Sequence, residues 1–457
     1  MSDITHATLF TTALCNLNCA YCYICKDKDG NLKQIDDDIA REFANDSYIN
    51  QILAYGDNIQ EKLDSLTLWG GEPFLHMERF TSRIDKWFEA FPNINKIDTS
   101  TNFTIPNQYK IVENLLAVIA KQPLKEPLFF DLQISIDGYE EMNDASRGTG
   151  VTQRFLENFR GLCHINYDRS KIRLYVHTKP TLSKATFHFL DTPEKCEKWF
   201  KFFDDEMFKP YSQAGQPFEF SLSLYNLAQP TEWTKEDGIY FAQVMRSMQS
   251  VDIKKYAGWR CYTTGVPIAG AMCHVEMNQP NKRFCDKMCG GGCGAFTHSI
   301  VPIPNGMYTM CHRGLFDEYV DYCNNVSKRD ELNGLSEAYF NPRNAQEWVY
   351  DLETFKKMNR AIAPLDDCPH QSIYTDWVIF IREYAKAGLI DKKWEDIKMI
   401  DKVIPYFMEN SYCVQDGYIF SGSWVTVAHL EIPVLFNGAM DVALDELEKI
   451  KREKGEL

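Results

Sequence analysis

Three cysteines near the start of the chain constrain its fold and chemistry more than any other feature. The stretch Leu14–Tyr23 reads LCNLNCAYCY and sets Cys15, Cys19 and Cys22 in a CxxxCxxC pattern. Three thiolates on a short loop can hold three irons of a [4Fe–4S] cube and leave the fourth iron open. Cys25 follows closely and is an alternative fourth ligand. A structural zinc site and a set of inert buried thiols are the other interpretations of this loop.

The composition narrows the class of protein. A chain of 457 residues is too long for one compact core, so we expect two or more domains. A net charge of −15 argues against a nucleic-acid binder, which normally carries a basic patch. We find no signal peptide and no run of about 18 apolar residues, so we expect a cytoplasmic protein without a membrane span. The 15 cysteines then favour metal or redox use over a disulfide framework.

Segments with the periodicity of strands and helices alternate along the first 250 residues. We expect strands at Ala7–Ala13, Leu63–Leu68, Asn95–Asn102, Phe130–Ile136, Ile172–Thr178 and Phe218–Tyr225. We expect helices at Asp38–Leu53, Met77–Trp87, Ile111–Ile119, Glu194–Phe203 and Thr234–Met248. This alternation predicts βαβ units, and therefore an α/β fold with a parallel sheet. In such folds, functional residues gather at the carboxyl ends of the strands.

Glycine and polar residues follow three of these predicted strands. They are Gly70, Gly71 and Glu72 after the second strand, Asn102 at the end of the third, and Ser135, Asp137 and Arg147 at or after the fourth. Glycines let the backbone approach a ligand closely, and the forked guanidinium of an arginine suits a carboxylate. A simple turn at the glycines and a solvated surface pair at the arginine are the alternatives.

The cysteine loop and these strand-end motifs together resemble the radical S-adenosylmethionine (SAM) superfamily. The resemblance implies a partial (β/α)6 TIM-like barrel over residues 1–250. It implies that Cys15, Cys19 and Cys22, and not Cys25, hold a [4Fe–4S] cluster whose open iron chelates SAM. The strand-end residues named above would then contact SAM. A reducing partner such as flavodoxin or ferredoxin is implied as well.

A second group of cysteines follows in residues 251–330. Cys293-x12-Gly306-x4-Cys311 fits a signature of the SPASM and twitch auxiliary-cluster domains, which implies at least one auxiliary [4Fe–4S] cluster. Besides Cys293 and Cys311, the candidate ligands are Cys285 or Cys289, and Cys323 or Cys368. The further cysteine run of SPASM domains is missing. A zinc knuckle with free thiols is the alternative.

His312 is a candidate for a catalytic residue. The sequence CHRGLFDEY, which begins at Cys311, is similar to the end of the auxiliary-domain hairpin in anaerobic sulfatase-maturating enzymes. In those enzymes an aspartate thought to act as a base follows the cysteine. Histidine can take a proton near neutral pH, although a surface polar role is the alternative. Residues 331–457 are expected to form a helix-rich segment, with helices at Thr375–Ala387 and Val442–Lys451, for which core packing is the default explanation.

Resemblance to the SPASM and twitch group implies hydrogen abstraction from a peptide or protein side chain. The hairpin that ends at Cys311 would offer a strand edge to such a chain. A small-molecule dehydrogenase or epimerase is the second hypothesis, and a non-catalytic iron–sulfur carrier is the third. The strand-end motifs argue against the carrier, because an electron carrier needs no SAM site.

Overall fold

A computed structural model describes the first half of the chain and three short later segments. The described residues are 4–22, 24, 31–215, 218–222, 226–227, 298–309, 312–315 and 349–362, with single residues between 237 and 251 and residue 452. The helices predicted at Thr375–Ala387 and Val442–Lys451 lie outside this part of the chain, as does most of Thr234–Met248.

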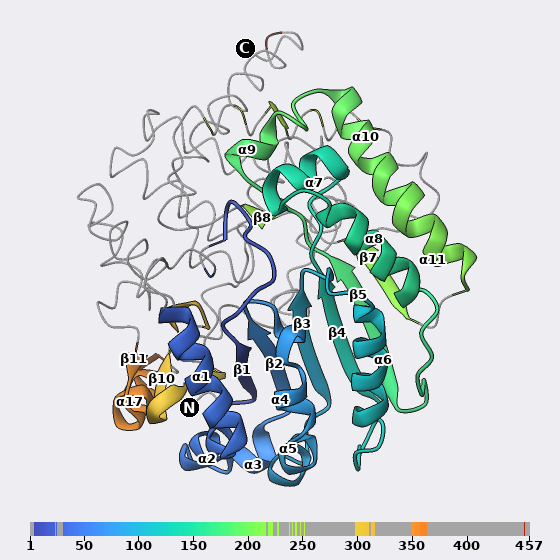
Figure 1. Ribbon diagram of the computed structural model, residues 1–457. Helices are drawn as coiled ribbons and strands as arrows, with labels where there is room; N and C mark the ends of the chain where they lie inside the picture. The colour runs from blue at the N-terminus through green and yellow to red at the C-terminus, as the bar shows by residue number, and fades with distance from the viewer. Residues whose placement is uncertain are drawn as a thin grey trace, which may run out of the picture.

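The described part is a mixed α/β structure around a nine-stranded sheet with the order β11-β10-β9-β1-β2-β3-β4-β5-β7. Its strands are β1 His6–Thr12, β2 Ser65–Gly70, β3 Lys96–Thr101, β4 Leu128–Ile134, β5 Ile172–Thr178, β7 Glu219–Leu222, β9 Ser299–Ile303, β10 Met307–Thr309 and β11 Val349–Tyr350. A small second sheet pairs β6 Thr181–Leu182 with β8 Asn226–Leu227. The strands from β1 to β7 are parallel and follow chain order, which confirms the predicted parallel sheet and is compatible with a partial barrel. In Figure 1 their arrowheads point towards the dark blue loop that follows β1.

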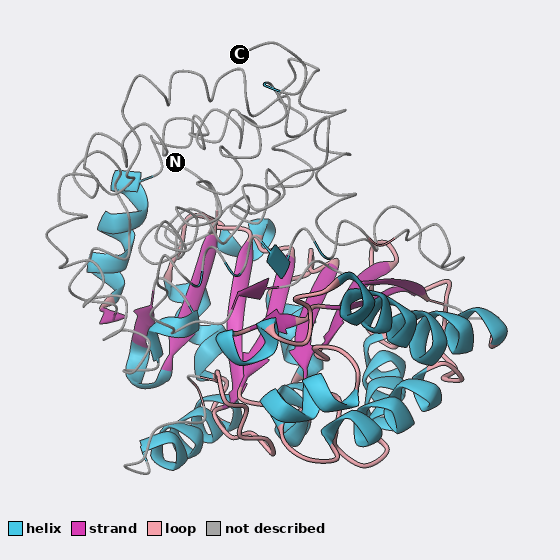
Figure 2. Ribbon diagram, turned by 90° about the horizontal axis from the view of Figure 1, so that it is seen from above, coloured by secondary structure: helices cyan, strands magenta, loops and turns pink. Residues whose placement is uncertain are grey.

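Helices fill most connections between the strands. The α-helices are α1 Asn31–Ala44, α2 Ser47–Ala54, α3 Ile59–Lys62, α4 Glu78–Thr81, α5 Ile84–Ala90, α6 Gln108–Ile119, α7 Glu140–Arg147, α8 Val151–Leu162, α9 Lys184–Phe187, α10 Pro193–Phe203, α11 Lys209–Gln213 and α17 Leu352–Ile362. Shorter turns are the 3-10 helices η1 Pro73–His76, η4 Pro304–Gly306 and η5 His312–Leu315, and the π-helix η2 Asp204–Phe208. Most of these helices lie on one side of the sheet (Figure 2).

The two faces of the sheet differ in character. On the helix-covered face, alternate residues of β2, β3 and β4, such as Leu66, Ile97 and Phe130, are fully buried. The residues between them point to the other face and are half-buried, as the alternating exposure of these strands shows. We call this second surface the polar face and define it by five side chains. They are His6, Thr67, Asp98, Asp131 and His177.

Two helix predictions were wrong in detail. The helix predicted at Asp38–Leu53 is two helices, because Asp46 between them has a left-handed backbone (φ 56°). The helix predicted at Met77–Trp87 is likewise divided into α4 and α5, with Arg83 at φ −120° before α5. Helices α7 and α8 between β4 and β5 were not predicted at all. Polar Asn143 and Arg147 obscure the apolar stripe of α7, yet both are buried and engaged in tertiary bonds.

The predicted hairpin around Gly306 is present, but it does not offer the strand edge that we expected. Strands β9 and β10 pair antiparallel, and β9 pairs parallel with β1, so the hairpin extends the main sheet. On its other side β10 pairs with β11 through Tyr308 and Thr309. The edge of β10 is therefore occupied, and an incoming peptide could not add a strand there without displacing β11.

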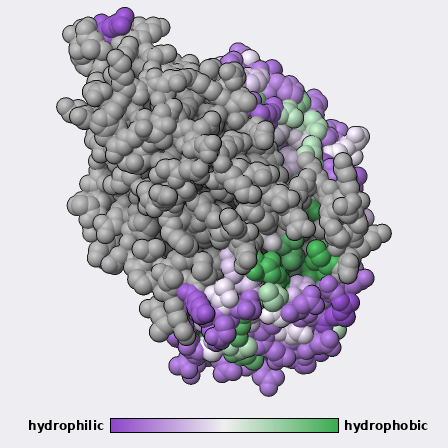
Figure 3. Space-filling view, turned by 90° about the vertical axis from the view of Figure 1, so that its left-hand side faces the viewer, coloured by the Kyte–Doolittle hydropathy of each residue, from purple (hydrophilic) through white to green (hydrophobic). Residues whose placement is uncertain are grey.

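The described surface is mostly hydrophilic on the side shown in Figure 3, with a small hydrophobic area. Val349, on β11, is the large apolar side chain with the highest exposure among the described residues, at 41%. Across the described ranges, no helix is both long and apolar enough to cross a bilayer.

Candidate metal centre

The cysteine loop lies over the carboxyl ends of four neighbouring strands. Cys15, Cys19 and Cys22 follow β1 directly, whereas Cys25 lies outside the described residues. The backbone amide of Glu72, just after β2, donates to the carbonyl of Leu14 at 2.7 Å. Further bonds reach the loop from the segments that follow β3 and β4. The loop is thus supported at each strand end where a motif was predicted.

The three cysteines are free thiols that share one small apolar cluster. Leu17, Cys19 and Val151 are buried together, and Cys15 and Cys22 pack against them. No group of three His, Cys, Asp or Glu side chains in the described residues converges closely enough to hold a single metal ion. A structural zinc needs its ligands about 2.3 Å from one ion, whereas the irons of a cube each take a separate thiolate. Three thiols on one loop can each supply a ligand to a separate iron of a cube.

Nitrogen donors point at the first cysteine. The backbone amide of Leu17 donates to Cys15 Sγ at 3.4 Å, and Asn102 Nδ2 approaches the same sulfur at 3.6 Å. Asn102 also donates to Asn16 Oδ1 at 2.8 Å and accepts from Thr104, so its amide is held in place. Hydrogen bonds to a ligating sulfur tune an iron–sulfur cluster, which makes Asn102 a neighbour of the metal site.

Burial opposes ionisation of the Cys19 thiol. It raises the pKa of Cys19 to about 12, while the positive charge of Arg147 acts in the opposite direction. Because iron binds the thiolate, loading this site would release protons.

The two glycines of the second motif make room for the cysteine loop itself. A Cβ atom on Gly70 would lie 2.0 Å from the carbonyl oxygen of Thr12, and one on Gly71 would lie 2.3 Å from that of Leu14. Either contact is too short for any side chain. The glycines allow a close approach, as expected, but the group that approaches them is the backbone around the cysteine loop.

Glu72 is buried, and its carboxylate accepts hydrogen bonds from other groups of the protein. Its carboxylate accepts from Thr101 Oγ1 and from the backbone amide of Asn102, both at 2.7 Å, and from the amide of Phe74 at 3.2 Å. Burial raises the pKa of Glu72 to about 7, against the effect of these donors. Its side chain ties the end of β3 to the turn after β2, and its backbone amide and carbonyl bond to Leu14 and Leu75.

Asp137 and Arg147 pair with each other below the loop. Arg147 donates to Asp137 through Nε at 2.9 Å and through Nη2 at 2.8 Å, and the two side chains are 6% and 0% exposed. Asp137 also accepts from the hydroxyl of Tyr21 at 2.7 Å and from the amide of Thr181 at 2.8 Å. The arginine fork grips a carboxylate, as its chemistry suggested, but that carboxylate belongs to the protein. Ser135 is half-buried and donates its amide to the carbonyl of Thr101.

A second ion pair near the loop was not predicted from the sequence. Asp36 of α1 binds both terminal nitrogens of Arg79 of α4 at 3.0 Å. It also accepts from Thr12 and, at 2.9 Å, from the amide of Ala13, two residues before the first cysteine. Asp36 stands in a run of three aspartates that looks like a solvated helix start, so no local signal distinguished it.

His312 lies against the sheet near the second motif. Its ring is 4.4 Å from the ring of Trp69, which directly precedes Gly70. The role of a base stays a prediction for this residue. The predicted auxiliary ligands Cys285, Cys289, Cys293, Cys311, Cys323 and Cys368 all lie outside the described residues.

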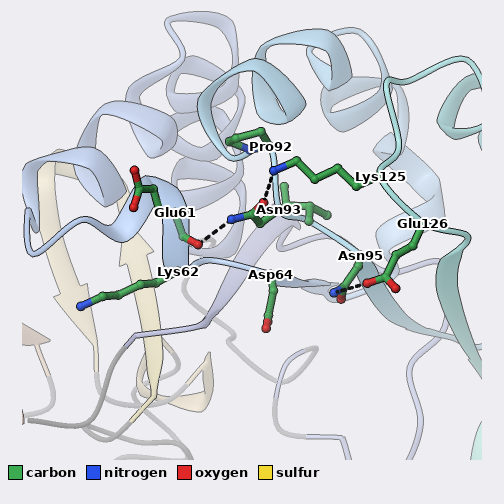
Figure 4. Close-up of a pocket in the computed structure, with 9 residues that line it drawn as sticks. Glu61, Lys62, Asp64, Pro92, Asn93, Asn95, Lys125 and Glu126 are labelled. Carbon is green, nitrogen blue, oxygen red and sulfur yellow. Dashed lines mark hydrogen bonds between the residues drawn. The ribbon is translucent and has the colours of Figure 1, made fainter.

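A polar pocket of about 250 Å³ opens at the opposite end of the sheet. It is lined by residues that precede β2, β3 and β4, including Asp64, Asn95 and Glu126. Figure 4 shows that its side chains bond to one another, as Asn95 Nδ2 does to Glu126 Oε1 at 3.0 Å. Since ligands of parallel α/β folds bind at the carboxyl ends of the strands, we do not assign this pocket to the site.

Comparison with known proteins supports the metal assignment. A protein-family model described as a 4Fe-4S single cluster domain matches residues 5–140, which include the cysteine loop and the two motifs that follow β2 and β3. A search of curated proteins finds none that matches the chain. The match and the three clustered thiols together support an iron–sulfur protein with a [4Fe–4S] cluster.

Proposed function

We propose that the chain is a radical SAM enzyme whose SAM-cleaving cluster is held by Cys15, Cys19 and Cys22, on a sheet that forms a partial (β/α)6 barrel. The observation that carries the proposal is the bonding of the three-cysteine loop to segments that follow β2, β3 and β4. An electron carrier needs cysteine ligands for its cluster, but it does not need the loop to be bonded to these strand ends. Three cysteine ligands leave one iron open to a further ligand, and polar strand ends beside it suit a polar one.

When bound, a cluster of this kind and SAM supply, after one-electron reduction, a 5′-deoxyadenosyl radical that can take a hydrogen atom from a substrate C–H bond. The chain's own residues hold and shield this site. Leu17, Cys19 and Val151 exclude water on one side of the loop. The side-chain amide of Asn102 approaches the sulfur of Cys15. Gly71 lets the backbone of Leu14 lie close to the end of β2. Glu72, Asp137 and Arg147 already bond to other groups of the protein. Among the proposed SAM contacts we therefore favour Gly70, Gly71 and Ser135.

The test is cleavage of SAM by anaerobically reconstituted protein under dithionite, with 5′-deoxyadenosine measured by mass spectrometry. Replacing Cys15, Cys19 and Cys22 together with alanine should reduce the product to the level of the blank. Cys163→Ala and Cys196→Ala are matched controls, because both thiols are buried in the core away from the loop. Both controls should keep the activity.

Three outcomes would redirect or exclude the assignment. A wild-type cluster that forms but cleaves no SAM would favour the electron carrier. Loss of cleavage in Cys25→Ala alone would show that the ligand set is wrong. Finding only zinc in anaerobically prepared protein would exclude the cluster.

For the substrate we propose a peptide or protein side chain, with a free small molecule as the alternative. The proposal rests on resemblance to the SPASM and twitch group, because the pairing of β10 with β11 removes the strand edge that we had expected to help. Reduced flavodoxin or ferredoxin is the proposed electron source. Incubation with SAM, reductant and candidate peptides should change the peptide mass. Turnover of a small molecule without any peptide turnover would favour the alternative.

A further inference from the structure

The ion pair between Asp36 and Arg79 holds the place where β1 passes into the cysteine loop. Arg79 Nη1 donates to the carbonyl of Thr11 at 2.9 Å. Asp36 Oδ1 accepts from the hydroxyl of Thr12 and, at 2.9 Å, from the amide of Ala13. The register of β1 against β2 shifts at the same place, which interrupts the regular ladder of the strand. The ion pair therefore holds three consecutive residues where the strand pairing is irregular.

The carboxylate reaches one residue further through a hydroxyl. Thr12 Oγ1 donates to Asp36 and accepts from the amide of Leu14 at 3.1 Å. Asp36 and Thr12 are buried, so water competes little for these bonds. Leu14 directly precedes Cys15, the first proposed ligand. The bonds of Asp36 thus extend along the backbone to the residue before the proposed metal site.

Asp36 also closes the cysteine loop. It belongs to α1, the first helix after the loop, and it lies 23 positions after Ala13, to which it bonds. The segment between these two residues contains Cys15, Cys19 and Cys22. A bond between the ends of such a segment removes conformational freedom that the segment would otherwise have. Arg79, from outside the segment, holds the carboxylate through two nitrogens at 3.0 Å.

We propose that Asp36, held by Arg79, is a positioning residue of the cluster site that keeps the cysteine loop in shape for the metal. A site that is already in shape needs less reorganisation to bind a cluster, and it releases the cluster more slowly. In this role the pair acts through the backbone of residues 11–14. The inference rests on the cluster site of the proposed function, but it does not depend on SAM cleavage.

The test is the rate at which a chelator removes iron from the anaerobically reconstituted full chain. Asp36→Ala should release iron about tenfold faster than the wild type, because loss of a residue that orients metal ligands commonly costs about tenfold or more in metal affinity. Thr12→Val keeps the shape of the side chain but removes the hydroxyl link, so it should also release iron faster. Thr12→Ser restores the hydroxyl and should bring the rate back towards that of the wild type.

Two controls separate positioning from general stability. Phe130→Ala removes a fully buried ring from β4 and destabilises the sheet, but it leaves the contacts of Asp36 in place. It should therefore keep the wild-type rate of iron release. Asp37→Ala, at the adjacent exposed position, should keep that rate as well. Thermal unfolding of the cluster-free proteins reports the stability of each variant.

Iron release at the wild-type rate in both Asp36→Ala and Thr12→Val would overturn the inference. Release from Phe130→Ala as fast as from Asp36→Ala would overturn it too, because general stability would then set the rate. If Asp36→Ala does not fold, the difference between Thr12→Val and Thr12→Ser decides the question.

Two results with the wild type separate this inference from the proposed function. A wild-type protein that forms no cluster would overturn both together. A set of proteins that releases iron as expected, but whose wild type cleaves no SAM, would support the positioning role and overturn the proposed function alone.

Discussion

The two faces of the central sheet are made by neighbouring residues of the same strands, yet they are held together differently. On the helix-covered face, Phe130 and Leu132 of β4 are fully buried among apolar side chains. On the polar face, Asp131 between them lies 2.9 Å from His177 of β5. Apolar burial is non-directional, whereas a half-buried charge needs a particular partner at a particular distance. The helix-covered face therefore stabilises the fold, whereas the polar face specifies the positions of individual side chains.

The largest expected effect concerns the apolar face. Phe130→Ala should lower the free energy of unfolding by about 4 kcal/mol, because it removes a fully buried ring and leaves a cavity. Phe129→Ala, one residue earlier and on the opposite face, is the matched control. Its ring is half-buried against Tyr175 and Arg173, so the loss should be less than half as large. Equal losses in urea unfolding would contradict the contrast between the two faces.

A smaller effect is expected at the ion pair behind the cysteine loop. Burial alone would raise the pKa of Asp36, but bonds from Arg79, Thr12 and Ala13 outweigh it and lower the pKa. Asp36→Asn should lower the free energy of unfolding by about 3 kcal/mol at pH 7, because it leaves a largely buried arginine without its charge partner.

Asp37→Asn, at the adjacent exposed position, is its control and should change the free energy of unfolding by less than about 0.5 kcal/mol. The contribution of Asp36 should also disappear in acid, as the pH falls below the ordinary pKa of an aspartate and through the lowered one. A variant as stable as the Asp37→Asn control would show that the pair is dispensable.

The smallest of the three effects depends on pH and concerns the polar face. His6 bonds to Ser65 and Thr67, and burial, aided by the charges of His298 and Lys96, lowers its pKa to about 3. The unfolded chain binds a proton at this residue below about pH 6.5, whereas the folded chain does not. Its contribution to stability is therefore complete above that pH and is lost as the pH falls.

The measurement is the difference in unfolding free energy between wild type and His6→Gln at pH 7 and at pH 5. The wild type should lose about 2 kcal/mol relative to the variant over this interval. His164→Gln, for which no such bonds are present among the described contacts, is the control. A difference that does not change with pH would mean that His6 is not kept neutral by the fold.

Local sequence patterns predicted much of the fold. The strand at Ile172–Thr178 was predicted with the bounds that the structure has, because its alternation is strong and local. Helices α7 and α8 were missed, since buried Asn143 and Asn158 make the sequence look polar although each amide bonds to a neighbouring element. The break at Asp46 was missed too, because a left-handed residue leaves little trace when it is not glycine.

The sequence by itself located the three cysteines on one loop and indicated the end of the sheet at which that loop lies. The spacing of Cys15, Cys19 and Cys22 is local, and the carboxyl ends of parallel strands must share one edge. The tertiary structure alone decided the partners of the charged residues. Tyr21 and Asp137 are 116 positions apart, and Glu72 reaches across to Thr101 and Asn102. An acidic residue that binds a ligand and one that bonds to a neighbouring side chain look the same in the sequence. Only the folded structure decides which hydrogen-bond donor lies beside the carboxylate once water has been removed from it.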